Sequence, residues 1–299
     1  GILAGDVLIK IDGKDTESMS MDDAAKLIRG KKGTDVILTI ERFNESELID
    51  FTLTREDIPV KDVSYFGMLD ESIGYIRLTR FSKNSHLEVE KAIKSLMGND
   101  MKSIVLDLRD NPGGLLNSAV KILDLFIDKK ELLVWTDGKA RQSNKKYFSK
   151  NDPIVPSDIQ IAVLINGGSA SASEIVAGVM QDLDRGVVIG RKSFGKGLVQ
   201  TVYNIDRNKA LKVTTAKYYI PSGRLIQKSG YLPDELLADT VSSDSLFETV
   251  GGREVKSGDG ITPDYIIKPD KNALGTHSFV RRLTPDSNHF LIISHQCQA

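Results

Sequence analysis

The sequence contains one cysteine, Cys297, so the chain cannot form an internal disulfide and gives no redox signal of its compartment. It also lacks an apolar run that approaches the roughly 18 residues of a membrane span. The sequence lacks an excess of charge of either sign, because its 40 Lys and Arg and 41 Asp and Glu give a formal net charge of -1. Dispersed basic residues with a net charge near zero provide no surface for nucleic acid or an acidic membrane, and we expect neither partner.

The first residues lack two further features, an initiating Met and a charged stretch followed by an apolar leader. Residues 1–6 instead have the composition of a turn that runs into the alternating segment 7–11. We interpret the chain as amino-terminally truncated, so that any leader peptide would not be visible.

The 299 residues, 40% hydrophobic and 27% charged, are typical of a globular protein with room for two domains. In residues 1–57, short alternating segments surround a helix expected at 21–29 and capped by Ser20, which indicates a small β-rich module. Residues 58–268 alternate strands with helices, which predicts an α/β domain with its ligand site at strand ends. Residues 269–299 contain three of the four histidines and no clear periodicity, and we treat them as an atypical tail.

The elements expected in the α/β domain are short apolar strands separated by amphipathic helices. The strands are predicted at 73–81, 103–109, 161–165, 187–189, 198–205 and 211–220, and the helices at 85–97, 115–127 and 171–181. The loops that join them hold the candidate functional residues.

The segment 166–174, Asn-Gly-Gly-Ser-Ala-Ser-Ala-Ser-Glu, lies between a predicted buried strand and a predicted helix. A serine at such a helix start, here Ser171, has its oxygen near unpaired backbone N–H groups and the positive end of the helix dipole. This environment favours an alkoxide or an oxyanion and therefore suits a catalytic nucleophile. Helix capping is the alternative, and the segment taken alone favours capping.

A nucleophilic serine needs a base, and the usual histidine has no good candidate here. His86 opens a polar helix, the other three histidines lie in the tail, and the Gly-x-Ser-x-Gly motif is absent. A lysine whose amine is held neutral by desolvation can replace histidine. Lys196 in Ser-Phe-Gly-Lys-Gly lies between two apolar strands, where the flanking glycines allow close backbone approach. A solvated loop lysine is the alternative interpretation.

The same stretch, 190–196, matches the first seven positions of a phosphate-binding P-loop. Gly197 occupies the place of the Ser or Thr that would hold magnesium, and a strand rather than a helix is predicted to follow. No helix N-terminus would then face the phosphates, so we expect no nucleotide.

A third segment, from Asp107 to Gly114, ends a predicted strand and enters a helix. Its paired glycines, Gly113 and Gly114, can direct N–H groups toward a reacting carbonyl, as an oxyanion hole requires. A tight strand-to-helix turn is the alternative, and it is favoured for this segment alone. We expect Asp107, Arg109 and Asp110 to form structural ion pairs rather than to act in catalysis.

The three segments in this order resemble the carboxyl-terminal processing peptidases, also called tail-specific proteases, from residue 1 to about residue 268. The resemblance implies a crotonase/ClpP-like α/β serine peptidase core preceded by a partial PDZ module, with no cofactor and no metal. It implies Ser171 as the nucleophile, Lys196 as the base and Gln200 as the residue that orients the lysine amine. The oxyanion donors that it implies are the N–H groups of Gly113 or Gly114 and of Ala172.

The resemblance also implies protein or peptide substrates with exposed carboxyl termini and a periplasmic or cell-envelope location. A PDZ groove beside the helix at 21–29 would bind the substrate tail by strand addition. The PDZ strand and carboxylate loop that should precede Gly1 are missing, so we expect weak selection for a free carboxyl terminus. Gln200 lies four residues after Lys196, a span of about 13 Å in a straight strand, so their contact requires a bend, for which Gly197 is suited.

Two other functions stay open at this point. A catalytically silent peptide-binding scaffold is disfavoured because Ser171, Lys196 and Gln200 are all retained. Acyl-CoA chemistry on a crotonase-like fold would use the glycine loop but would leave the serine and lysine idle. The sequence does not predict the oligomeric state.

Overall fold

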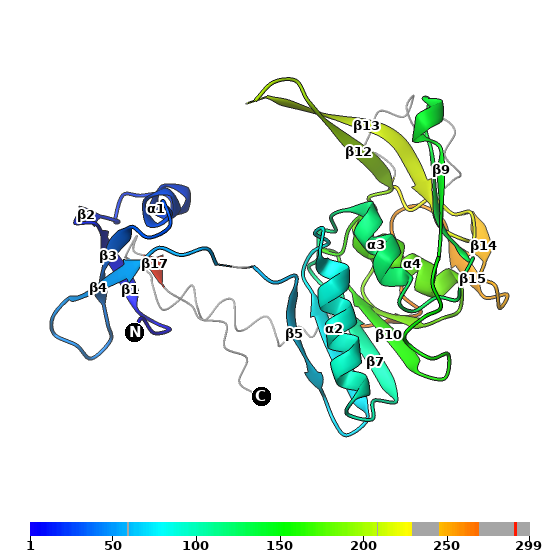
Figure 1. The fold of residues 1–299 in the computed structure, drawn as a ribbon, viewed down its shortest axis with the longest axis horizontal. Helices are drawn as coiled ribbons and strands as arrows, with labels where there is room; N and C mark the ends of the chain where they lie inside the picture. Colours follow the sequence, from blue (N-terminus) through cyan, green and yellow to red (C-terminus); the bar gives the residue numbers. More distant parts are fainter. Residues whose placement is uncertain (59, 208, 229–244, 269–289, 292–299) are drawn as a thin grey trace. The chain divides into compact units, whose positions relative to one another are not determined.

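The computed structural model describes residues 1–58, 60–207, 209–228, 245–268 and 290–291 (Figure 1). They form two compact units, one of Gly1–Val60 with the described part of the carboxyl-terminal segment and one of Lys61–Lys268. Among the described helices, none has the length and apolar character needed to cross a bilayer.

The first unit is a small antiparallel sheet with one helix. The order of its strands is β17-β1-β3-β4, with β2 paired to β1. Their bounds are β1 Val7–Ile11, β2 Lys14–Asp15, β3 Asp35–Glu41, β4 Ile49–Thr54 and β17 Phe290–Leu291, and helix α1 is Met21–Ile28. The predicted cap of α1 is confirmed, because the Ser20 hydroxyl accepts a hydrogen bond from the Asp23 N–H at 3.2 Å.

The carboxyl-terminal tail contributes one described element to this unit. Phe290 pairs with Leu8 and Leu291 with Val7, so β17 lies antiparallel to β1. This strand was not predicted, because the sequence of the tail has no clear periodicity. The rest of 269–299 lies outside the described residues.

The second unit is built on a mostly parallel six-stranded sheet of order β16-β11-β10-β7-β6-β5, in which only β5 runs antiparallel to its neighbour. The bounds are β5 Val63–Met68, β6 Ile73–Leu78, β7 Ser103–Asp107, β10 Gln160–Ile165, β11 Val187–Gly190 and β16 Tyr265–Ile266. Helices α2 Ser85–Met97, α3 Leu116–Leu123 and α4 Ala172–Asp182 connect the parallel strands. This alternation confirms the predicted α/β class.

A second sheet of order β12-β13-β8-β9 covers the other side of the helices, since both α3 and α4 contact β8. Its bounds are β8 Leu132–Asp137, β9 Lys145–Phe148, β12 Leu198–Asn204 and β13 Ala210–Tyr219, and β14 Leu246–Glu248 pairs separately with β15 Glu254–Lys256. Figure 1 shows the β12–β13 ribbon projecting from the rest of this unit. The sequence analysis did not identify β5, β8, β9, β14, β15 or β16.

Helix α4 is the centre of the second unit. It contacts β10 and β11 of one sheet and β8 of the other, and all of its residues are buried. A helix enclosed on every side must satisfy its polar groups inside the protein. At its carboxyl end, Asp182 forms an ion pair of 2.7 Å with Arg224, and both side chains are at most 1% exposed. Burial raises the pKa of the Asp182 carboxyl, and the Arg224 guanidinium opposes that rise.

We predict that Arg224→Met destabilises the second unit strongly, because Asp182 then stays buried without its counter-ion. Removal of one partner of a buried pair costs about 3–5 kcal/mol. The matched control is Lys192→Ala, which breaks the exposed pair between Lys192 and Asp259 and costs about 1 kcal/mol or less. Urea unfolding measures both effects. Equal losses of free energy in the two variants would contradict the prediction.

Candidate active site

Ser171 lies at the N-cap of α4 with φ +56° and ψ −113°. A residue other than glycine in this region carries strain of about 1–3 kcal/mol, and such strain is concentrated at functional sites. Although the sequence lacks Gly-x-Ser-x-Gly, the chain makes a sharp strand-to-helix turn that presents one partly exposed serine. The absence of the motif therefore did not exclude a strained serine at a helix start.

The two serines that flank Ser171 have structural roles. The Ser169 hydroxyl donates to the Leu108 carbonyl at 2.7 Å, and the Ser173 hydroxyl donates to the Asn111 carbonyl at 2.9 Å. Both serines are fully buried. They tie the Ser171 turn to the loop that follows β7.

Gly113 brings the glycine loop against the Ser171 turn. A Cβ atom at Gly113 would lie 2.5 Å from the Ala170 carbonyl oxygen and 2.9 Å from the Ala172 nitrogen, and its φ is +93°. Only glycine permits this approach. The Gly113 N–H donates to Asn111 Oδ1 at 2.9 Å, so it already has an acceptor.

Gly114 and Ala172 supply the other two oxyanion candidates. Gly114 is exposed, and its N–H has no acceptor among the residues that the structure describes. The N–H of Ala172, the first residue of α4, likewise has no described acceptor, as is usual in a first helical turn. These two N–H groups remain available to a ligand.

The predicted ion pairs of this loop are confirmed in part. Arg109 pairs with the buried carboxylate of Asp107 at 2.6 Å, and Tyr75 donates to the same carboxylate at 2.6 Å. Asp110 instead accepts a hydrogen bond from the Asn166 side-chain amide at 2.9 Å. The loop is therefore held by hydrogen bonds from Tyr75 in β6 and from Asn166 just after β10.

Lys196 lies in the loop between β11 and β12, and a buried carboxylate joins this loop to the Ser171 turn. Glu174 Oε2 accepts from the Ser171 N–H at 2.7 Å and from the Lys196 N–H at 2.8 Å. Its Oε1 accepts from the Ser193 hydroxyl at 2.5 Å and from the Gly195 N–H at 2.6 Å. The main chains of Ser171 and Lys196 are therefore joined through one oxygen atom.

Glu174 is fully buried and forms no ion pair within the described part of the chain. Burial raises the pKa of the Glu174 carboxyl, and the bonds from Ser193, Lys196, Gly195 and Ser171 oppose that rise. Three of these four donors are backbone N–H groups, which cannot accept a hydrogen bond from a protonated carboxyl, so their arrangement fits the ionised carboxylate. The N-terminus of α4 adds a favourable dipole.

The other side of the Lys196 loop is held by strand β13 and the residues after it. The Tyr218 hydroxyl donates to the Lys196 carbonyl, and the Tyr218 N–H donates to the Gly197 carbonyl at 3.0 Å. The Gly197 N–H donates to Gln227 Oε1 at 2.9 Å. A Cβ at Gly197 would lie 2.6 Å from the Gln227 nitrogen, so the glycine serves close approach.

Gln200 lies in β12, after a break in strand register between Val199 and Gln200. The register there skips Thr215, so the extra residue lies in β13. Gly197 lies in the loop just before β12, and the bend predicted there stays a prediction. No hydrogen bond between the Gln200 side chain and the Lys196 amine is present in the described structure. Both side chains are partly exposed.

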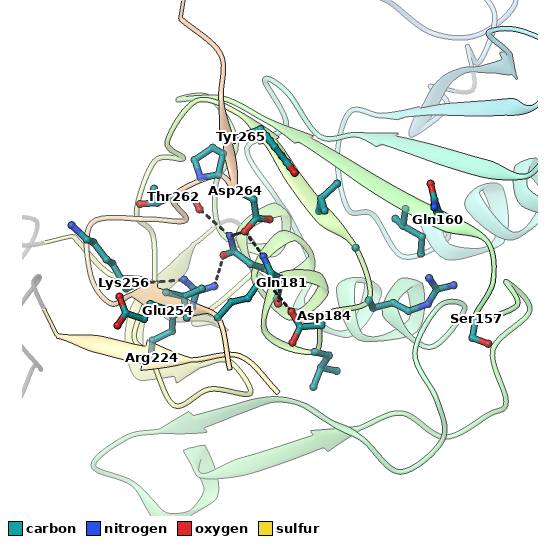
Figure 2. Close-up of a pocket in the computed structure, with 18 of the residues that line it drawn as sticks. Ser157, Gln160, Gln181, Asp184, Arg224, Glu254, Lys256, Thr262, Asp264 and Tyr265 are labelled. Carbon is teal, nitrogen blue, oxygen red and sulfur yellow. Dashed lines mark hydrogen bonds and ion pairs between the residues drawn. The ribbon is translucent and has the colours of Figure 1, made fainter. Parts of the chain in front are cut away.

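A pocket of roughly 1100 Å³ lies near the opposite end of α4, and none of the predicted site residues lines it. Figure 2 shows Gln181 bonded to the Thr262 carbonyl, Asp264 and Arg224. Ten residues separate Gln181 from Ser171, which corresponds to about 15 Å of helix. This pocket is separate from the candidate active site.

The fold and this arrangement are typical of a serine protease with a PDZ module. A family model described as peptidase family S41 matches residues 72–237, and a PDZ domain model matches residues 1–42. The chain belongs to peptidase family S41, and its relatives are carboxyl-terminal processing proteases. The predicted family and fold class are confirmed.

Two curated relatives and two solved structures illustrate the match. A carboxy-terminal-processing protease of Bartonella bacilliformis is 40% identical over 94% of this chain and 64% of its own length. A carboxyl-terminal-processing protease of Synechocystis sp. is 38% identical over 81% of this chain and 57% of its own length. The chain thus spans about three fifths of these relatives.

The solved photosystem II D1 C-terminal processing protease is 27% identical, with a TM-score of 0.54, over 90% of this chain and 65% of that one. An S41 protease structure from Bacteroides fragilis has a TM-score of 0.55 at 16% identity, covers 95% of this chain and 74% of that one, and supports the fold alone.

We predict that Gly113→Ala destabilises the second unit by about 1–3 kcal/mol, because the new methyl group collides with backbone atoms of the Ser171 turn. Gly167→Ala is the matched control, since a Cβ there meets no atom within 4 Å. We expect that control to change stability by less than about 0.5 kcal/mol. Thermal unfolding measures both variants, and a tolerated Gly113→Ala would show that the turn is not closely packed.

Proposed function

We propose that this chain is a serine endopeptidase that cleaves proteins near their carboxyl termini, with Ser171 as nucleophile and Lys196 as base. The observation that supports this assignment most strongly is the shared Glu174 oxygen, which holds the strained serine and the lysine main chain together. The family membership supports the reaction class.

In the proposed reaction, the Ser171 hydroxyl oxygen attacks the carbonyl carbon of the scissile peptide while the Lys196 amine takes the hydroxyl proton. The resulting ammonium then protonates the leaving amine, and an acyl-enzyme ester remains on Ser171. Lys196 next takes a proton from water, which hydrolyses the ester and restores the serine.

The oxyanion of each tetrahedral intermediate would be stabilised by the N–H groups of Gly114 and Ala172 at the positive end of α4. Gly114 is favoured over Gly113 because the Gly113 N–H already donates to Asn111. This choice was open from the sequence. Gln200 is proposed to orient the Lys196 amine once a substrate orders both side chains.

We further propose that residues 1–57 act as a PDZ module for the substrate tail, and that 58–268 form the peptidase domain. The match of residues 1–42 to a PDZ domain model supports strand addition as the binding mode. The physiological substrates are proposed to be proteins of the cell envelope with exposed carboxyl termini.

We predict that Ser171→Ala and Lys196→Ala each lower kcat by roughly 10⁴-fold or more, and that the double variant is no worse, because the two residues act as a unit. The measurement is cleavage of a peptide library followed by mass spectrometry, with fluorophosphonate labelling of Ser171 as a second readout. Replacement of all four histidines is the control and should leave cleavage intact. If one histidine substitution stopped cleavage while Lys196→Ala did not, the proposed base would be wrong.

We predict that Gln200→Ala lowers kcat by less, up to about 10²-fold, because it misplaces the lysine amine without removing it. Steady-state kinetics on one peptide from the library measures this effect. A loss as large as that of Lys196→Ala would instead make Gln200 indispensable to proton transfer.

A further inference from the structure

Two buried side chains from different elements hold the Lys196 segment beside the Ser171 turn. Glu174, from α4, accepts from the main-chain N–H groups of Ser171 and Lys196 at 2.7 and 2.8 Å. Tyr218, from β13, donates through its hydroxyl to the Lys196 carbonyl and through its N–H to the Gly197 carbonyl at 3.0 Å. Lys196 is thus held at its N–H by one residue and at its carbonyl by the other.

We propose that Tyr218 and Glu174 are positioning residues that together fix the Lys196 main chain against the Ser171 turn. This inference rests on the proposed function, because it assigns the two residues to the serine and lysine pair. Neither residue touches the substrate in this proposal. Each acts by keeping the lysine stem and the serine oxygen in one fixed arrangement.

Tyr218 suits this role because it is rigid and stays protonated. Its side chain is 1% exposed and belongs to the hydrophobic core of the second unit. Burial and the nearby Glu174 carboxylate raise the pKa of the Tyr218 hydroxyl well above its ordinary value. The hydroxyl therefore keeps the proton that it donates to the Lys196 carbonyl.

Glu174 suits the role because its two oxygens serve four donors at once. A glutamine at this position has one oxygen and an NH₂ group that only donates, so it can serve either the Ser171 and Lys196 side or the Ser193 and Gly195 side. The two donors on the remaining side then face the NH₂ group, which cannot accept their hydrogen bonds, so they must move away from it. Glu174→Gln is therefore expected to loosen the connection between the Ser171 turn and the segment 193–196 while it preserves the side-chain volume.

The first experiment compares Tyr218→Phe with Tyr219→Phe in the 299-residue protein. Tyr218→Phe removes only the hydroxyl, and we expect kcat to fall by about 10-fold to 10²-fold with KM changed by less than about twofold, because only the reacting groups are misplaced. The rate of fluorophosphonate labelling of Ser171 should fall in parallel. Tyr219 stacks on Trp135 with ring centroids 5.2 Å apart, which phenylalanine preserves, so this control removes a tyrosine hydroxyl from β13 outside the contacts of Lys196, and we expect kcat to stay within about twofold.

The second experiment tests whether the two residues act together. We expect Glu174→Gln to lower kcat as Tyr218→Phe does, and the double variant to lose less than the product of the two single losses, because both changes loosen the same main-chain segment. Assays are run below the unfolding midpoint of each variant, so that a loss of rate reflects position rather than unfolding.

Three results would overturn the inference. They are an unchanged kcat in Tyr218→Phe, a loss confined to KM, and independent, multiplicative losses in the double variant. Ser171→Ala separates these failures from failure of the proposed function. If Ser171→Ala abolishes cleavage while Tyr218→Phe does not slow it, the serine mechanism stands and the positioning role is wrong. If Ser171→Ala remains active, the proposed function itself fails.

Discussion

The Glu174 carboxylate is the interaction on which the candidate site depends. It is buried at the start of α4 and forms no ion pair within the described residues, yet it accepts four hydrogen bonds from two separate loops. A buried charge is tolerated only where such donors replace water. Because the donors come from the Ser171 turn and from the segment 193–196, satisfying the charge also assembles the two halves of the site.

The conformations of the surrounding residues follow from this constraint. The Ser171 turn must bring its N–H to the carboxylate, and it does so at a strained φ of +56°. The glycine loop must then lie against the turn, where Gly113 leaves no room for a Cβ. Tyr218 and Gln227 close the lysine loop from the other side. The strain at Ser171 is thus held in place by contacts on three sides.

The sequence predicted the candidate residues better than the contacts that position them. Ser171 and Lys196 stand out as a serine at a helix start and a lysine between glycines, and both signals are local. Glu174 was not singled out, because its partners at 193–196 are about twenty residues away in the chain. Tyr218 falls within the strand predicted at 211–220 and was not singled out either. Gly197 was expected to allow a bend, and the structure shows that its backbone also lies close to Gln227. The sequence did not distinguish the two roles, because a glycine needed for close approach has the same sequence signal as a glycine needed for a bend.

The two acidic residues near the ends of α4 need different partners because they lie at opposite ends of the helix dipole. An anion at the N-terminus is stabilised by the dipole, whereas an anion at the C-terminus is destabilised by it. Glu174, at the favourable end, is satisfied by three N–H groups and one hydroxyl, none of them from a cationic side chain. Asp182, at the unfavourable end, is paired with the buried Arg224. Asp182 lies eleven residues after Ser171, or about 16 Å along the helix, so the charged pair of α4 is remote from the proposed nucleophile.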